Sequence, residues 1–226
     1  MLDWMIPWEG RGVNLEKQLN LHHAESREEL VNWSPSGRLP GKIVLLLGID
    51  DKPGKGEGMV EKILVAYATK YGATAEIAEK IGEVLRRSGH TVEVLPADRA
   101  DDPAQYRAVV LGSAVYAGQW RKEAAEFLEA NAAKLAELPV WLFSSGPTGE
   151  GDPVELMKGW RFPQALQHIA DRIKPRDVAF FHGELDQSKL NLPEKLIVKG
   201  IKAPLGDYRD WEAIAAWAEN IAEALG

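Results

Sequence analysis

The sequence predicts a three-layer α/β domain over residues 59–226, in which helices cover both faces of a parallel sheet. Short apolar segments alternate along the chain with longer ones in which apolar residues recur every three or four positions. The short segments are almost continuously apolar, which is typical of strands buried on both faces. Strands that alternate with helices form parallel sheets through right-handed crossovers.

Five apolar segments are expected to form the sheet and four amphipathic segments the helices. The strands are expected at residues 61–68, 91–95, 108–112, 140–143 and 178–182. The helices are expected at residues 75–87, 121–138 and 163–173, with a last one from about Tyr208 onward. Thr74 has the side chain of an N-cap residue for the first helix, and Arg86 and Arg87 stand before Gly89 at its predicted end.

The composition indicates a globular protein and excludes several classes of site. Hydrophobic residues make up 45% of the 226 residues and charged residues 27%, as in ordinary soluble proteins. The chain has no cysteine, which excludes disulfides, thiolate zinc sites, iron–sulfur clusters and cysteine nucleophiles. A net charge of −7 disfavours nucleic-acid binding. Residues 1–12 lack the basic and apolar parts of a secretory signal, so the expected compartment is the cytoplasm, with the inner face of the membrane as the alternative.

Residues 1–58 are expected to form an irregular extension rather than a domain. Their one strand-like segment is 42–48, and the glycine-, proline- and charge-rich stretch 50–58 has the composition of a linker. Residues 55–58 (KGEG) require purine-rich codons directly before Met59, as in a ribosome-binding site before a start codon. One hypothesis is therefore that translation begins at Met59. The alternative is an accessory segment whose strand packs on the sheet edge.

Three loops with small or hydroxyl-bearing residues follow the first, third and fourth predicted strands. In open α/β sheets, ligands bind outside the carboxyl ends of the strands, so these loops are expected to form one binding edge. The first loop offers hydroxyls, a glycine and backbone amides at a helix start, which suits a phosphate group, although a plain capped turn has similar residues. It consists of Thr69, Lys70, Tyr71, Gly72, Ala73 and Thr74.

The second and third loops allow a flat ligand to approach the backbone closely. The second contains Ser113, Ala114, Val115, Tyr116, Ala117 and Gly118, and the third contains Ser144, Ser145, Gly146, Pro147, Thr148, Gly149 and Glu150. A mobile surface loop has a composition like that of the third. Tyr116 is expected to face the ligand, whereas Trp120 is expected to cover the apolar edge of the sheet.

Motifs of several other α/β proteins are absent from the sequence. There is no G-x-G-x-x-G dinucleotide fingerprint, no G-x-x-x-x-G-K-[ST] phosphate loop and no G-x-S-x-G nucleophile elbow. The positions that carry the acidic cluster and phospho-accepting Asp of receiver domains hold other residues here. The histidines are expected on the surface or in turns rather than as metal ligands, and they are His22, His23, His90, His168 and His182.

Residues 61–225 resemble the flavodoxin-like family of FMN-binding proteins. The first loop is similar to the family's phosphate motif T-x-T-G-x-T at Thr69, Gly72 and Thr74, and differs at Tyr71. Within that family the resemblance is closest to the flavodoxin-type, quinone-dependent protoporphyrinogen oxidases and their bacterial relatives. It lies in the stretches 112–118 and 190–202 and in the C-terminal residues Asp210, Trp211, Glu212, Trp217 and Ile221.

The resemblance implies a flavodoxin-like three-layer sandwich with a five-stranded parallel sheet in the order 2-1-3-4-5. It implies that the FMN phosphate binds residues 69–74 and that the isoalloxazine ring lies between residues 113–118 and 144–150. The flavin would carry the chemistry, so no catalytic side chain is expected. Lys70 would aid phosphate binding or would be a solvated surface lysine.

Three functions follow from this resemblance as alternatives. The first is an FMN-dependent oxidoreductase, quinone-linked and of the protoporphyrinogen oxidase type. The second is an electron carrier between protein partners, and the third a flavin-free interaction module. Basic and apolar residues alternate in segment 190–202, which is expected to meet a quinone, a porphyrin-like substrate or a membrane surface, or to be an ordinary helix with its lysines in water.

Overall fold

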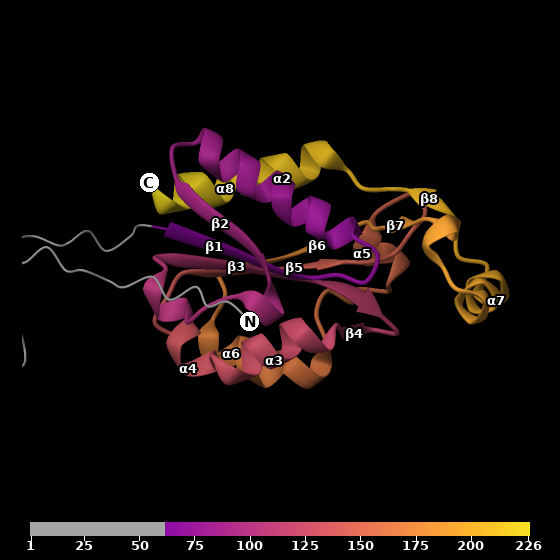
Figure 1. Cartoon of the computed structure of the whole chain (residues 1–226), viewed down its shortest axis with the longest axis horizontal. Coiled ribbons are helices and arrows are strands. Elements are labelled where there is room, and N and C mark those ends of the chain that lie inside the picture. The colour runs from indigo at the N-terminus through magenta and orange to yellow at the C-terminus, as the bar shows by residue number, and fades with distance from the viewer. Residues whose placement is uncertain (1–61) are drawn as a thin grey trace, which may run out of the picture. The chain divides into compact units, whose positions relative to one another are not determined.

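The computed structural model describes residues 62–226 (Figure 1). The predicted strand at 42–48, the linker and the proposed start at Met59 lie outside the described residues, so they remain predictions. None of the helices within residues 62–226 has the length and apolarity needed to cross a lipid bilayer.

Five parallel strands form the central sheet, and their order confirms the predicted 2-1-3-4-5 arrangement. The order is β2-β1-β3-β5-β6, and a short strand β4 pairs antiparallel with β3. Each predicted strand is present, with its ends shifted by a few residues. The strands are β1 (Lys62–Ala68), β2 (Thr91–Pro96), β3 (Ala108–Tyr116), β4 (Gln119–Trp120), β5 (Val140–Ser145) and β6 (Asp177–Phe181).

Helices cover both faces of the sheet, which confirms the three-layer architecture (Figure 1). Helices α2 (Ala73–Arg87) and α8 (Trp211–Leu225) lie on one face, and α3 (Lys122–Ala130), α4 (Ala132–Leu135) and α6 (Gln167–Ile173) on the other. Adjacent residues of β1 alternate between the two faces: Ile63 and Val65 join the cluster under α2 and α8, whereas Leu64 and Ala66 join the opposite one. This double burial explains why the strand is continuously apolar.

Helix α2 has the predicted inward face but a different N-cap. Ile77, Ile81 and Leu85 are fully buried, as their spacing predicts. The N-cap is Gly72, at φ 98°, and no side chain caps the helix. Thr74 was expected to be the cap, which is wrong: it is the second helical residue, and its hydroxyl makes a buried hydrogen bond instead. Glycine reaches this left-handed conformation without the steric cost that other residues incur.

Two of the other predicted helices are shorter than expected. The helix predicted at 121–138 is divided into α3 and α4 at Asn131, whose side-chain amide donates to the carbonyl of Phe127 at 2.9 Å. Such local side-chain bonds to the backbone compete with a continuous helix. The helix predicted at 163–173 begins as a 3₁₀ turn at Gln164–Leu166 and becomes α6. Other 3₁₀ turns are Ala97–Arg99, Pro103–Gln105 and Gln187–Lys189.

Further short elements lie at or beyond the carboxyl ends of the strands. They are α5 (Pro153–Leu156), β7 (Glu184–Leu185), α7 (Leu192–Ile201) and β8 (Gly206–Asp207). Strands β7 and β8 pair antiparallel and close the base of an excursion, residues 184–207, that carries α7. Figure 1 shows α7 at the far right of the view, away from the central sheet.

Candidate functional site

The first predicted loop ends in a helix start that leaves backbone amides available. The hydroxyl of Thr69 accepts a hydrogen bond from the Gly72 amide at 3.0 Å and closes the loop. The first intrahelical bond runs from the Glu76 amide to the Gly72 carbonyl at 3.1 Å. Because no side chain caps α2, the amides of residues 73–75 remain donors at the positive end of the helix dipole. This arrangement can bind an anion such as a phosphate group.

The second predicted loop is a β-hairpin, which differs from the expectation. Strand β3 does not end at Gly112 but continues through Tyr116 and pairs with β4, so that Tyr116 lies opposite Gln119. The two-residue turn consists of Ala117 (φ 50°) and Gly118 (φ 73°), the paired positive φ values of a tight hairpin turn. This pairing could not be predicted from the sequence, because β4 is only two residues long and shows no strand pattern.

Serine and threonine hydroxyls of the three segments bond mainly to the protein itself. Ser113 accepts from the Arg121 amide and donates to the Ala114 carbonyl, both at 2.9 Å. Ser144 accepts from the indole nitrogen of Trp120 at 2.8 Å and donates to the Arg161 carbonyl at 3.0 Å. These hydroxyls therefore hold the second and third segments in place. The interpretation of Trp120 as a residue that covers the sheet is confirmed by its burial.

One hydrogen bond joins the first and third segments directly. The hydroxyl oxygens of Thr74 and Ser145 lie 2.8 Å apart, and both side chains are buried. Ser145 is the last residue of β5, and Thr74 lies in the first turn of α2. The bond thus sets the distance between the helix start and the third segment.

The third segment is held against the end of β6 by a histidine that sequence reasoning misassigned. His182 was expected on the surface or in a turn; it does follow β6 outside any regular element, but the surface expectation is wrong, since the residue is only 9% exposed. Its Nδ1 lies 3.1 Å from the Pro147 carbonyl oxygen and its Nε2 2.8 Å from that of Gly151. The amide of Gly146 also donates to the Phe181 carbonyl at 3.0 Å. The position of His182 after a strand gave no signal of this role.

Lys70 connects the first segment with Tyr116 and with α7. Its ammonium group forms an ion pair with the Glu194 carboxylate and lies 5.1 Å from the centroid of the Tyr71 ring and 5.7 Å from that of Tyr116. Hydrogen bonding to Lys70 lowers the pKa of Glu194 to about 2, and the same bond raises the pKa of Lys70. Lys70 is therefore not simply a solvated surface lysine.

Two side chains at this edge have unused binding capacity. The hydroxyl of Tyr71 is buried and makes no hydrogen bond within the described residues, and burial raises its pKa. Tyr116, the last residue of β3, is 43% exposed. Tyr71 occupies the motif position where a smaller hydroxyl residue is usual. The edge therefore combines an unpaired hydroxyl, free amides and an exposed aromatic ring, which fits a ligand with a phosphate group and a flat ring.

Arg209 anchors the excursion to the first turn of α2, and sequence reasoning missed it. Its side chain is 4% exposed and lies 4.5 Å from the centre of the Trp211 ring. Nη1 lies 2.8 Å from the Glu76 carboxylate and donates to the Ala73 carbonyl at 3.2 Å, while Nη2 lies 2.8 Å from the Asp207 carboxylate. Hydrogen bonding to Arg209 lowers the pKa of Asp207.

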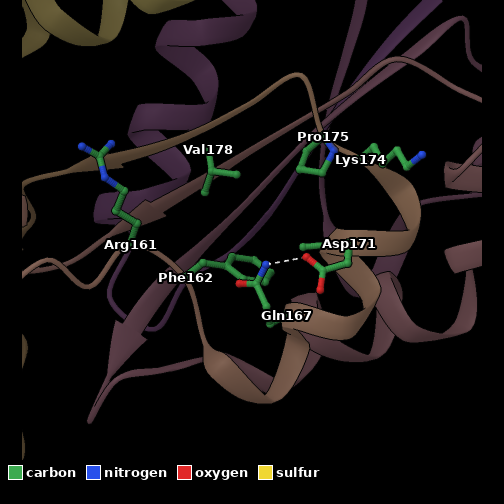
Figure 2. A pocket seen from close by; sticks show the side chains of 8 residues that line it. Arg161, Phe162, Gln167, Asp171, Lys174, Pro175 and Val178 are labelled. Carbon is green, nitrogen blue, oxygen red and sulfur yellow. Dashed lines mark hydrogen bonds between the residues drawn. The ribbon is translucent and has the colours of Figure 1, made fainter.

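A separate pocket of about 480 Å³ contains none of the predicted site residues. Figure 2 shows it beside α6, with the side-chain amide of Gln167 donating to Asp171 at 2.8 Å. It is lined by Arg161, Phe162, Gln167, Ala170, Asp171, Lys174, Pro175 and Val178. Across residues 62–226, no group of three or more His, Cys, Asp or Glu side chains is placed to hold a metal ion.

Comparisons with known proteins agree with this fold. A curated relative, protoporphyrinogen IX dehydrogenase (quinone) of Escherichia coli K12, is 24% identical over 177 residues, covering 71% of this chain and 94% of the relative. A flavodoxin from the domain Archaea superposes with a TM-score of 0.51 at 13% identity, covering 73% of this chain and 98% of that one.

A second solved structure shares the fold within a larger protein. Rubredoxin oxygen:oxidoreductase of Desulfovibrio gigas superposes with a TM-score of 0.50 at 14% identity, covering 73% of this chain but 36% of its own. The family model described as "Flavodoxin domain" matches residues 64–211, which span most of β1, the three predicted binding segments and the excursion. The chain belongs to the flavodoxin domain family.

Proposed function

We propose that this protein binds FMN at the carboxyl edge of its sheet and acts as a quinone-linked oxidoreductase. The observation that carries the proposal is the uncapped start of α2 at Gly72, within a loop similar to the family's phosphate motif. The Tyr71 hydroxyl, buried beside the Lys70–Glu194 pair, supplies one more donor for a phosphate oxygen. Membership of the flavodoxin family implies a flavin cofactor, and FMN is the flavin that has a terminal phosphate group.

Each segment of the edge has a separate role in this proposal. The free amides of residues 73–75 hold the phosphate, and Tyr71 and Thr69 shape the loop before them. The exposed ring of Tyr116 packs against one side of the isoalloxazine, and the backbone of residues 146–150 borders the other. The flavin supplies the redox chemistry, and the protein tunes it through nearby amides, carbonyls and charges. Lys70 places a positive charge between the phosphate loop and Tyr116.

The excursion at residues 184–207 supports an enzyme rather than an electron carrier. A carrier must expose the edge of its flavin to another protein, whereas here Glu194 of α7 reaches the phosphate loop through Lys70. The curated relative that covers 71% of this chain is named as a protoporphyrinogen IX dehydrogenase that uses quinone. A tetrapyrrole-type donor and a quinone acceptor are therefore the substrates we propose.

The first experiment asks whether the protein binds FMN. The purified protein should be yellow, and mass spectrometry of the released chromophore should identify FMN. Apoprotein titrated with FMN should gain about 2.7 kcal/mol in unfolding free energy at a hundred times the Kd. Riboflavin, which lacks the phosphate, should stabilise it much less. A colourless protein that FMN does not stabilise would instead be the interaction module.

The second experiment separates an enzyme from a carrier. The flavin-loaded protein is mixed with protoporphyrinogen IX and a soluble quinone, and quinone reduction is followed over many turnovers. An enzyme reduces far more quinone than there is protein present. A carrier exchanges about one equivalent of electrons with these compounds and then needs a protein partner. Quinone reduction that stops after about one equivalent per protein molecule would therefore contradict the oxidoreductase proposal.

A further inference from the structure

Helix α7 exposes an apolar face that the rest of the described protein does not cover. Leu192 is 78% exposed, Leu196 73% and Ile197 61%. At about 100° per residue, these three positions fall within an arc of about 140° on one side of the helix. Neither of the two buried clusters takes in a described side chain of α7. Most single exposed leucines need no explanation, but a contiguous exposed apolar face marks an interaction surface.

Lysines border this apolar face and a neighbouring hollow. Lys195 and Lys199 lie along one edge of α7, and Lys202 follows at its end. Together with Leu190 and the 46% exposed Leu205, these residues line a hollow of about 600 Å³ beside the helix. The surface thus combines apolar side chains with flexible positive charges around them.

The one acidic residue of the helix is turned to the protein. Glu194 pairs with Lys70, and it completes a capping box with Asn191, whose side chain accepts from the Glu194 amide at 2.9 Å. The cap holds the helix start, and the ion pair removes the negative charge from the outer surface. The charge that α7 presents outward is therefore positive, although the whole chain carries −7.

We propose that α7 is a docking surface for a bilayer that contains anionic phospholipids. Leu192, Leu196 and Ile197 enter the boundary between headgroups and acyl chains, and Lys195 and Lys199 meet the lipid phosphates. At ten residues the helix is about 15 Å long, half the thickness of the hydrocarbon layer, so it lies in the interface and does not span it. The attraction is local, because charges beyond about 10 Å are screened.

Docking would present the flavin edge to the membrane. The excursion that carries α7 is joined to the phosphate loop through the Lys70–Glu194 pair and to the first turn of α2 through Arg209. A bilayer bound at α7 therefore lies next to the edge at which we place FMN. Lipophilic compounds dissolved in the bilayer would then be close to that edge. Lipid binding itself does not require the flavin, so its test is independent of the proposed function.

The test is co-sedimentation of the full chain with vesicles. Wild-type protein should sediment with phosphatidylcholine–phosphatidylglycerol vesicles (7:3) and remain in solution with phosphatidylcholine alone. The double variant Lys195→Glu/Lys199→Glu should lower the partition coefficient at least about thirtyfold, and raised NaCl should weaken wild-type binding. Leu196→Asn/Ile197→Asn should also lose binding, because both changes remove apolar area without disturbing a core.

A matched variant controls for overall charge. Lys122→Glu/Lys158→Glu changes the net charge equally at two exposed lysines outside the excursion, and it should bind vesicles more than tenfold better than the α7 pair. Equal losses of vesicle binding in the two charge variants would overturn the proposal. Wild-type protein that does not bind anionic vesicles would overturn it as well. A vesicle-free dimer that Leu196→Asn dissociates would also overturn it, since the apolar face would then belong to a second copy of the chain.

Discussion

Arg209 and Glu76 form an ion pair across 133 residues of sequence, with Nη1 of Arg209 2.8 Å from a carboxylate oxygen of Glu76. The pair fixes the end of the excursion against the first turn of α2, next to the amides that we assign to phosphate binding. It makes the position of the excursion and the geometry of the binding edge depend on each other.

Replacing Arg209 with alanine should lower the unfolding free energy by about 1–3 kcal/mol, because hydrogen bonds to several carboxylates are lost together. The loss of stability is modest for a buried arginine, since Glu76 and Asp207 are about half-exposed and water screens their charges. Urea denaturation measures the change. Arg87→Ala removes only an exposed helix pair with Glu83 and should cost less than about 0.5 kcal/mol. Equal losses in both variants would contradict a special role for Arg209.

Gly112→Ala should destabilise the protein by about 3 kcal/mol or more, or prevent folding. An added Cβ would lie 2.0 Å from the ring of Phe143, which is fully buried and cannot move away. Gly200→Ala in α7 meets nothing within 4 Å and should raise helix stability by up to about 1 kcal/mol. Thermal unfolding of both variants tests the contrast, and a tolerated Gly112→Ala would mean that Phe143 repacks.

The Lys70–Glu194 pair should depend on pH in the acid range. The pKa of Glu194 in the folded protein is about 2, below its ordinary 4.5, because the ionised form is stabilised by Lys70. The contribution of the pair is therefore complete above about pH 4.5 and is lost as the pH falls toward about 2. Carbon-detected NMR of the Glu194 carboxyl should show a titration midpoint near pH 2, and this signal should be absent from the Glu194→Gln variant. A midpoint near 4.5 would mean that the pair does not form.

Gly72→Ala should weaken FMN binding about tenfold while affecting riboflavin much less. The glycine has a φ of 98°, which an alanine adopts at a cost of about 1–2 kcal/mol, so the loop would shift its amides away from the phosphate. Fluorescence titration of the apoprotein with both flavins measures the difference. Gly89→Ala, at φ 93° on a distant turn, is the matched control and should leave both affinities unchanged. An equal loss for both flavins would place the phosphate elsewhere.

The sheet and its helices could be predicted from the sequence because their signals are local. The apolar runs of β1 and β5 are buried on both faces, and the repeat of Ile77, Ile81 and Leu85 marks the inner face of α2. Burial of apolar area is the main favourable contribution to folding. The spacing of apolar residues along the chain therefore indicates which elements form and which of their faces are buried. The same patterns predicted that the three segments we assign to flavin binding lie at the carboxyl ends of strands.

What only the tertiary structure decided is the role of individual polar side chains. His182 holds the third segment, Ser113 and Ser144 bond within the protein, and β3 extends to Tyr116 because β4 pairs with it. A polar side chain can pair with many partners, and its choice depends on groups that lie far away in the chain, as with Arg209 and Glu76. Apolar periodicity thus determined the architecture from the sequence alone, whereas hydrogen bonds and ion pairs became assignable only once the folded chain had brought their partners together.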